Sequence, residues 1–181
     1  MLEASLVSTE NDLYQIAALS QANHVSQVSE EAEEGFVTWV YTPGVLKTLH
    51  AIVPSIIVRD GDVLAGYALS LTRACAEVYR PMREMMESIS GIPYKGKPLG
   101  EQRMYIMGQI CVDSRYRGQG VVEQLYRFHR DRFSPDFDVL VTEISVRNPR
   151  SLRAHEKAGF RTIHTYDAED GRWQVVAWDW A

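Results

Sequence analysis

Several features that define other classes of protein are scarce or absent in this chain of 181 residues. Its two cysteines, Cys75 and Cys111, are too few for a disulfide framework or a four-cysteine zinc site. The histidines form no H-x-x-x-H or comparable pair, so no metal is expected. No apolar run approaches the ~18 residues that a membrane-spanning helix needs. The start, Met1–Ser5, lacks the basic and apolar regions of a secretory signal. We therefore expect a cytoplasmic protein that does not bind membranes.

Positive charge is also in short supply. Lys and Arg number 19 against 24 Asp and Glu, and the formal net charge is −5. This balance argues against a nucleic-acid-binding protein, whose surface is usually basic. Apolar residues make up 45% of the chain, enough for a hydrophobic core. The length fits one domain over residues 1–181.

Strand and helix patterns alternate in the middle of the chain, and hairpin signals stand at both ends. Asp60-Gly61 separates two apolar runs, which is typical of a tight β-turn. This alternation predicts a mixed α/β sheet. We expect strands at 4–7, 55–59, 63–69, 104–112, 139–146, 160–166 and 173–180, helices at 77–89, 119–133 and 151–158, and a loop at 91–100.

The most informative stretch is Ile110–Val122, which reads as a strand, a tight turn and the start of a helix. Gly118 and Gly120 lack Cβ atoms, so backbone N–H groups there can approach a ligand closely. The following helix adds a positive dipole end and free N–H donors. Arg115 and Arg117 add formal charge beside the turn. Together these features suit a pyrophosphate group, although an ordinary helix start would share some of them.

The turn matches neither of the two common phosphate loops. It has no G-x-x-x-x-G-K-[ST] pattern, and no G-x-G-x-x-G followed by an acidic residue ~20 positions later. The pattern that is present, Arg115-x-x-Gly118-x-Gly120, resembles the acetyl-CoA-binding motif of the GNAT family of N-acetyltransferases.

A second motif lies downstream, between Asn148 and Phe160. Asn148 suits the N-cap of a helix, Pro149 its first position and Gly159 the position after its end. The string H-E-K-A-G-F that starts at His155 is similar to the other GNAT signature. The two matches stand in the family's order with one strand between them, and together they cover about residues 104–160.

The resemblance implies a GNAT-like fold with acetyl-CoA as co-substrate. The expected fold is α/β, with a mostly antiparallel central sheet of about six or seven strands flanked by helices. One strand pair should splay apart and admit the pantetheine arm. The N–H near Val112 should polarise the acetyl carbonyl, and Asn148 should contact the pantetheine arm. The implied cofactor-binding residues are Ile110, Cys111, Val112, Arg115, Tyr116, Arg117, Gly118, Gln119, Gly120, Val121, Asn148 and Ser151.

His155 is the first candidate for catalysis. The family usually carries at this place a tyrosine that protonates the departing thiolate, and an imidazole can do the same. The alternative is that His155 packs at the helix edge or hydrogen-bonds the cofactor. Cys111 could in principle form an acyl-enzyme, but a strand thiol without a neighbouring base is more often a small core residue.

The general base is less defined. Some family members carry a glutamate at the position that aligns with Met104, which cannot accept a proton. Glu143 is the first choice in its place, although it could be a surface carboxylate or a chain of waters could do the work. The other candidates on neighbouring strands are Tyr67, Tyr105 and Gln109.

The resemblance implies transfer of an acetyl group from acetyl-CoA to the primary amine of a small molecule or peptide, by direct attack in a ternary complex. The alternatives are a catalytically silent acyl-CoA sensor and an unrelated nucleotide-binding domain. The acidic stretch Ser29–Glu34 would favour a cationic acceptor, and the Met-rich segment 77–100 could form an apolar wall or simply pack on the sheet. The aromatic strand 173–180 could pair with a second copy in a homodimer, or be covered within one chain.

Overall fold

The computed structural model describes residues 1–27 and 35–180. A seven-stranded sheet with the order β1-β2-β3-β6-β7-β9-β8 forms its centre. β6 and β7 run parallel, whereas the other neighbours in this sheet are antiparallel. The strands are β1 (Leu2–Leu6), β2 (Ile56–Asp60), β3 (Val63–Leu71), β6 (Met104–Val112), β7 (Val139–Ser145), β8 (Arg161–Ala168) and β9 (Gly171–Asp179), and β4 (Pro93–Tyr94) and β5 (Lys97–Pro98) form a separate hairpin.

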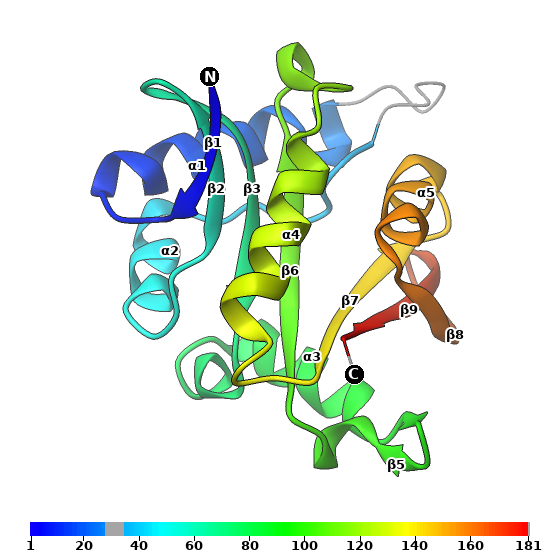
Figure 1. The fold of residues 1–181 in the computed structure, drawn as a ribbon. Helices are drawn as coiled ribbons and strands as arrows, with labels where there is room; N and C mark the ends of the chain where they lie inside the picture. The colour runs from blue at the N-terminus through cyan, green and yellow to red at the C-terminus, as the bar shows by residue number, and fades with distance from the viewer. Residues whose placement is uncertain (28–34, 181) are drawn as a thin grey trace.

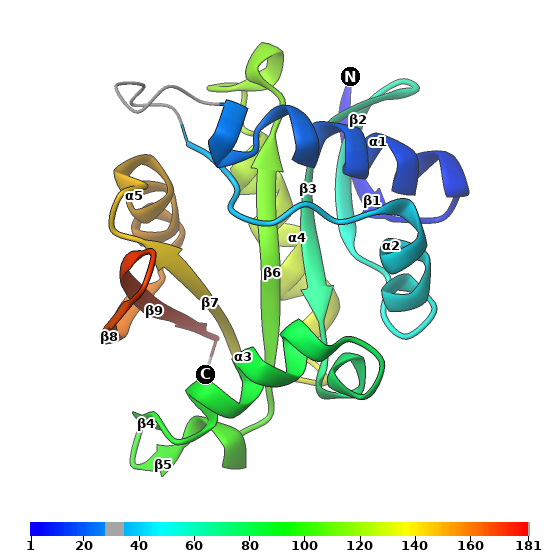
Figure 2. The ribbon, with the colours of Figure 1, turned by 180° about the vertical axis from the view of Figure 1, so that it is seen from behind.

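Helices cover both faces of this sheet. α4 crosses the front of the sheet with α5 beside it, and α1 and α3 lie on the opposite face (Figures 1 and 2). The predicted mixed sheet with flanking helices is thereby confirmed. The helices are α1 (Glu10–Ala22), α2 (Pro43–His50), α3 (Arg80–Ser90), α4 (Val121–Phe133) and α5 (Pro149–Ala158).

Burial along the strands follows this layering. Every residue of β3 except Val63 is buried, because helices pack on both of its faces. β8 at the edge of the sheet is exposed along most of its length. The core therefore centres on β3, β6 and β7, and the two sequence motifs lie at the end of β6 and directly after β7.

The strands β6 and β7 separate soon after they begin. Only Met104–Ile106 and Val139–Val141 pair, three residue pairs in all. Beyond them the two strands diverge into a wedge (Figure 1). The divergence leaves one backbone edge of each strand free of a neighbouring strand, as the family resemblance implied.

A bulge in β6 lies inside this wedge. Ala68 of β3 pairs with Ile110, but Ser70 pairs with Met107, so β6 contains one extra residue. Gly108 lies in the bulge, where an added Cβ would come within 2.5 Å of a Leu71 side-chain carbon. Glycine at this position allows the strands to approach closely, and the bulge changes the direction in which the following side chains point.

Three local expectations need correction. α3 begins at Arg80, because a 3-10 turn occupies Arg73–Glu77 before it. The predicted loop at 91–100 contains the β4–β5 hairpin, whose turn uses the positive φ of Lys95 and Gly96. The C-terminal strand β9 is not an edge: it lies between β7 and β8, so it is covered within the chain.

In the part of the chain that the structure describes, no helix has both the length and the apolar character needed to cross a membrane.

Candidate active site

The turn after β6 has the geometry that its glycines predicted. Gly118 and Gly120 have φ values of 74° and 79°, in the left-handed region that glycine accepts without strain. Apart from the chain neighbours of each glycine, no described atom lies within 4 Å of the Cβ position at Gly118 or Gly120. Gly120 is the N-cap of α4 and offers no side-chain cap. The first N–H groups of α4 therefore remain available to a ligand.

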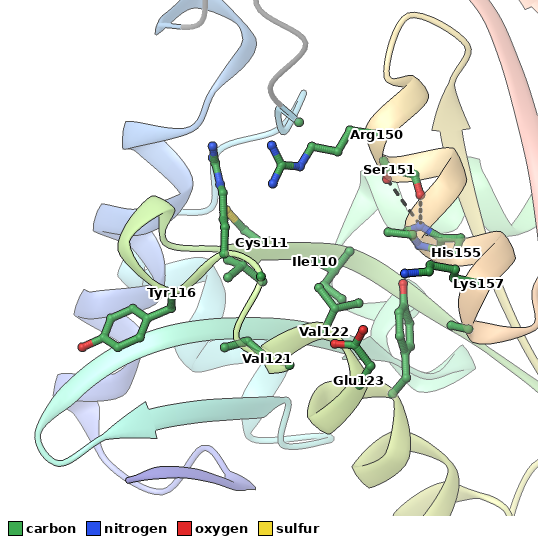
Figure 3. A pocket seen from close by; sticks show the side chains of 18 of the residues that line it. Ile110, Cys111, Tyr116, Val121, Val122, Glu123, Arg150, Ser151, His155 and Lys157 are labelled. Carbon is green, nitrogen blue, oxygen red and sulfur yellow. Dashed lines mark hydrogen bonds between the residues drawn. The ribbon is translucent and has the colours of Figure 1, made fainter.

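A cleft of about 690 Å³ opens beside this turn and is lined by the facing sides of α4 and α5 (Figure 3). We call it the large cleft. Val121, Val122 and Glu123 line one side of it and Ser151 and His155 the other. The residues predicted to bind acetyl-CoA all line this cleft except Arg115 and Gln119.

Arg115 and Gln119 instead hold the turn in shape. The Arg115 guanidinium lies 2.7 Å from the Asp113 carboxylate, and its backbone N–H donates to Asp113 Oδ1 at 2.9 Å. The Gln119 amide donates to the Arg115 carbonyl at 2.8 Å. Both residues belong to the turn, but neither lines the large cleft.

The large cleft is rich in positive charge, although the chain as a whole is acidic. Glu123 is the one acidic side chain among its described lining residues. The surplus of cations suits a ligand with several phosphate groups. The motifs alone did not identify the cations on the helices, whose signal is a spacing of three residues on α4 and of seven residues on α5. The cationic lining residues are Arg117, Arg127, Arg130, Arg150 and Lys157.

A second cavity of about 80 Å³ adjoins the first. We call it the small cavity. It is lined mainly by residues 36–39, by β6 around its bulge, by Thr142–Ser145 of β7 and by Trp173 of β9. The two cavities share six lining residues, so they meet in the wedge between β6 and β7. The shared residues are Phe36, Val37, Ile110, Asn148, Ser151 and His155.

The sheet register places two tryptophan side chains of β9 on opposite faces of the sheet. Trp178 pairs with Leu140, and its ring lies 5.9 Å from that of Tyr126 on α4. Trp173 is an odd number of residues away from Trp178, so its side chain points to the other face. Glu143 pairs with Val175, which is two residues from Trp173 on β9. Glu143 and Trp173 therefore lie on the same face of the sheet. The large cleft and the small cavity therefore reach the wedge from opposite sides of the sheet.

Residues 35–41 cross the wedge, and we call this segment the strap. The Asn148 amide donates to the Phe36 carbonyl at 2.9 Å, and the Gln109 amide donates to the Trp39 carbonyl at 2.7 Å. Asn148 Oδ1 also accepts from the Ser151 N–H at 3.1 Å, as an N-cap does. The Asn148 side chain thus holds the strap and α5 in place beside both cavities.

His155 is 2% exposed and lies where the two cavities meet. Its Nδ1 is 2.8 Å from the Ser151 carbonyl oxygen, which can only accept, so Nδ1 carries a proton (Figure 3). Burial lowers the pKa of His155 to about 4, and the ring is neutral at pH 7. Nε2 therefore presents a lone pair, and it has no hydrogen-bond partner among the described residues.

Glu143 lines the small cavity from β7. Burial raises the pKa of its carboxyl group, while a hydrogen bond from the Tyr166 hydroxyl opposes that shift. Oε1 is buried and has no partner within the described part of the chain. A carboxylate with a raised pKa and a free oxygen is suited to accept a proton.

The tyrosines considered as alternative bases are buried and hydrogen-bonded to other side chains. Tyr67 is fully buried and hydrogen-bonds Gln109, while Tyr105 lies 3.1 Å from the Nδ1 atom of buried His129. Met104 is buried and lines neither cavity. Burial raises the pKa of Cys111 to about 12, so its thiol stays protonated at neutral pH and is a poor nucleophile.

The expected acceptor-binding segments have different outcomes. Ser29–Glu34 lies outside the described residues. Met82 and Met86 of α3 are buried in the core, and segment 77–100 contributes no residue to the small cavity. Among residues 1–27 and 35–180, no group of three or more His, Cys, Asp or Glu side chains could hold a metal ion.

Comparison with known proteins now gives the wedge and its turn a context. A model of the acetyltransferase (GNAT) family matches residues 27–160. The chain belongs to the GNAT family. This match spans both motifs and the strands β2, β3, β6 and β7.

Solved structures agree with this fold. The chain is similar to one from the NatC complex bound to Gag peptide and CoA, with 16% identity, a TM-score of 0.70 and 99% of each chain covered. It is similar to the ribosomal-protein-S18-alanine N-acetyltransferase from Escherichia coli, with 16% identity, a TM-score of 0.61 and coverage of 99% and 94%. The chain is also similar to yncA, a putative acetyltransferase from Salmonella typhimurium with its cofactor acetyl-CoA. The identity is 16%, the TM-score is 0.62, and 98% of this chain and 93% of that chain are covered. No curated protein matches. At these identities the likeness establishes the GNAT fold.

Proposed function

We propose that this GNAT protein is an N-acetyltransferase that moves the acetyl group of acetyl-CoA to a primary amine by direct attack in a ternary complex. The observation that carries the proposal is the meeting of two unlike cavities in the wedge between β6 and β7. One is large and cationic, and the other is small and carries a buried carboxylate. Such an arrangement suits two substrates that react where they meet.

The large cleft fits acetyl-CoA. Free N–H groups at Gly120 and the start of α4 would bind the pyrophosphate, and the surrounding arginines and lysine would neutralise the phosphates. The Asp113 N–H donates to the Ala65 carbonyl on β3 at 2.9 Å. Backbone direction alternates along a strand, so the Val112 N–H points into the wedge. There it would donate to the thioester carbonyl and stabilise negative charge on that oxygen.

Glu143 and His155 would handle the protons. Glu143 takes a proton from the incoming ammonium, and the neutral amine attacks the carbonyl carbon. A C–N bond forms, and the C–S bond breaks with its electron pair on sulfur. His155 Nε2 accepts the second proton from nitrogen and passes it to sulfur, which leaves as a thiol. His155 thus serves as an acid only after it has acted as a base, because its resting Nε2 carries no proton.

A thiol-release assay and calorimetry with acetyl-CoA test this proposal together. We expect the protein to bind acetyl-CoA and to release thiol in the presence of an accepted amine. His155→Phe and Glu143→Gln should each lower kcat by about 100-fold, with the Kd of acetyl-CoA changed by less than about twofold. Glu156→Gln, at an exposed carboxylate on α5 that lines neither cavity, is the matched control for turnover.

The contrary outcomes are distinct. Unchanged turnover of His155→Phe across pH would remove His155 from the proton path. Tight binding of acetyl-CoA without release of thiol in the presence of any tested amine would favour the catalytically silent sensor. A sensor needs no proton donor, so the unprotonated Nε2 of His155 is compatible with that function. Strong binding of a different nucleotide beside weak binding of CoA would overturn the proposal.

A further inference from the structure

The mouth of the small cavity combines aromatic surface with one negative charge. Trp39 enters from the strap and is 49% exposed, and Trp173 enters from β9. Glu143 is the one formally charged side chain among the described lining residues. Its unpartnered Oε1 is buried, so a cation that reaches it would gain an ion pair shielded from water.

Several of the other polar side chains around the cavity are already hydrogen-bonded within the protein. Gln109 donates to the Trp39 carbonyl at 2.7 Å and accepts from the Ser20 hydroxyl at 3.1 Å. The Asn148 amide is used on the strap and on α5. Among the buried side-chain atoms that line the cavity, Glu143 Oε1 and His155 Nε2 are the two without a partner within the described residues, so the other buried polar atoms offer little to hydroxyl groups on an acceptor.

The size of the cavity limits what enters it. Its volume of about 80 Å³ compares with a share of ~30 Å³ for one water molecule in the liquid. An ammonium group and its first carbon atoms fit, and the rest of the acceptor has to lie outside. There it meets the indoles of Trp39 and Trp173, which favour hydrocarbon and the positive end of an amine.

We propose that the acceptor is a primary amine on an apolar or aromatic carbon skeleton, with its ammonium at Glu143 and its hydrocarbon between Trp39 and Trp173. This inference rests on the proposed acetyltransferase function and names its substrate class. A free arylalkylamine and a peptide whose first residue is apolar present the same chemistry. The experiment below separates these two sources.

Initial rates of thiol release test the substrate class. We compare phenethylamine and hexylamine with glucosamine, and a peptide that begins with Phe with one that begins with Ser. The apolar member of each comparison should have a kcat/KM at least about tenfold higher. The two comparisons also show whether free amines or peptides are the better source. Equal or faster turnover of glucosamine and the Ser peptide would overturn the inference.

Substitutions locate the preference. Trp39→Ala and Trp173→Ala should each raise the KM of the apolar amine about tenfold and leave the KM of acetyl-CoA unchanged. Trp173→Phe keeps an aromatic surface and should retain most of the preference, which guards against loss of folding in the alanine variant. Tyr14→Ala is the control, since Tyr14 is 60% exposed on α1 and lines neither cavity.

The two proposals fail in different ways. If no amine releases thiol, the acetyltransferase function itself is wrong. If amines are acetylated without regard to their carbon skeleton, or if the tryptophan variants keep the wild-type KM, only the substrate class is wrong.

Discussion

The two cavities of this GNAT protein are built on different principles. The large cleft relies on backbone N–H groups and on charges that project from two helices. The small cavity relies on a few side chains from the strap, β6, β7 and β9. The glycine turn of the large cleft is one continuous segment and is set by local sequence, whereas the small cavity is made from separate segments and depends on the whole fold. The predictions below test whether this division holds.

The largest expected effect is on the backbone-built site. Gly120→Val places a branched side chain at a positive φ of 79° and beside the proposed pyrophosphate position. We expect the Kd of acetyl-CoA to rise by about 100-fold, equivalent to about 2.7 kcal/mol. Calorimetry measures it. Gly44→Val on α2, where no atom lies within 4 Å, should bind normally. Equal loss in both variants would show a general effect on folding.

The second prediction concerns His155, which both cavities share. An unfolded histidine has its pKa near 6.5, and burial lowers that of His155 to about 4. The unfolded chain therefore binds more protons between these values, so His155 makes stability fall as pH drops from 6.5 toward 4. His155→Phe should reduce the loss of unfolding free energy between pH 7.5 and pH 5 by about 2 kcal/mol.

Urea unfolding at the two pH values gives this difference. His164→Phe, at an exposed position on β8, is the control and should leave the difference at its wild-type value. The same loss in His155→Phe as in wild type would mean that His155 is not held neutral.

The third prediction removes charge from the large cleft and not from the small cavity. The double substitution of Arg150→Gln and Lys157→Gln should raise the Kd of acetyl-CoA by about tenfold at low salt and by less at high salt. The KM of the amine should not change. Arg153→Gln on the exposed side of α5 is the matched control. If the KM of the amine changed as much as the Kd of acetyl-CoA, the charges of the large cleft would also act on the amine in the small cavity.

The smallest effect is expected at Tyr126, a cleft residue whose buried hydroxyl has no partner among the described residues. Tyr126→Phe removes an unsatisfied polar group, so the free protein should gain about 1 kcal/mol, or about 2–4 °C in Tm. In Tyr105→Phe the hydroxyl that is lost has His129 as partner at 3.1 Å, so stability should fall. A less stable Tyr126→Phe would indicate that the hydroxyl has a partner in solution.

The sequence predicted the two kinds of site unequally. The turn at Gly118 and Gly120 and the helix after Asn148 carry local signals, because turn and cap geometry depend on neighbouring residues. The place of the turn was predicted from these signals, whereas the fold class came from the alternation of strand and helix patterns and the details of the sheet from the resemblance to the GNAT family. The cations of α4 and α5 were not, since helix-face charges are usually solvated and only the packing of two helices brings them together.

The small cavity shows the limit more clearly. Trp39, Glu143 and Trp173 are far apart in sequence, and their meeting depends on the strap, on the wedge and on the pairing of β7 with β9. The state of His155 also depends on tertiary burial and on one carbonyl, so its motif position suggested an acid where the resting ring offers a lone pair. Position in a motif predicts location better than protonation.

The short parallel pairing between β6 and β7 has a mechanical consequence. It joins four strands on one side of the sheet to three on the other through three residue pairs. A molecule bound between β6 and β7 would contact both halves of the sheet and hold them together. Ligand binding should therefore raise the free energy of unfolding of the whole domain, and the melting temperature should rise with the concentration of ligand.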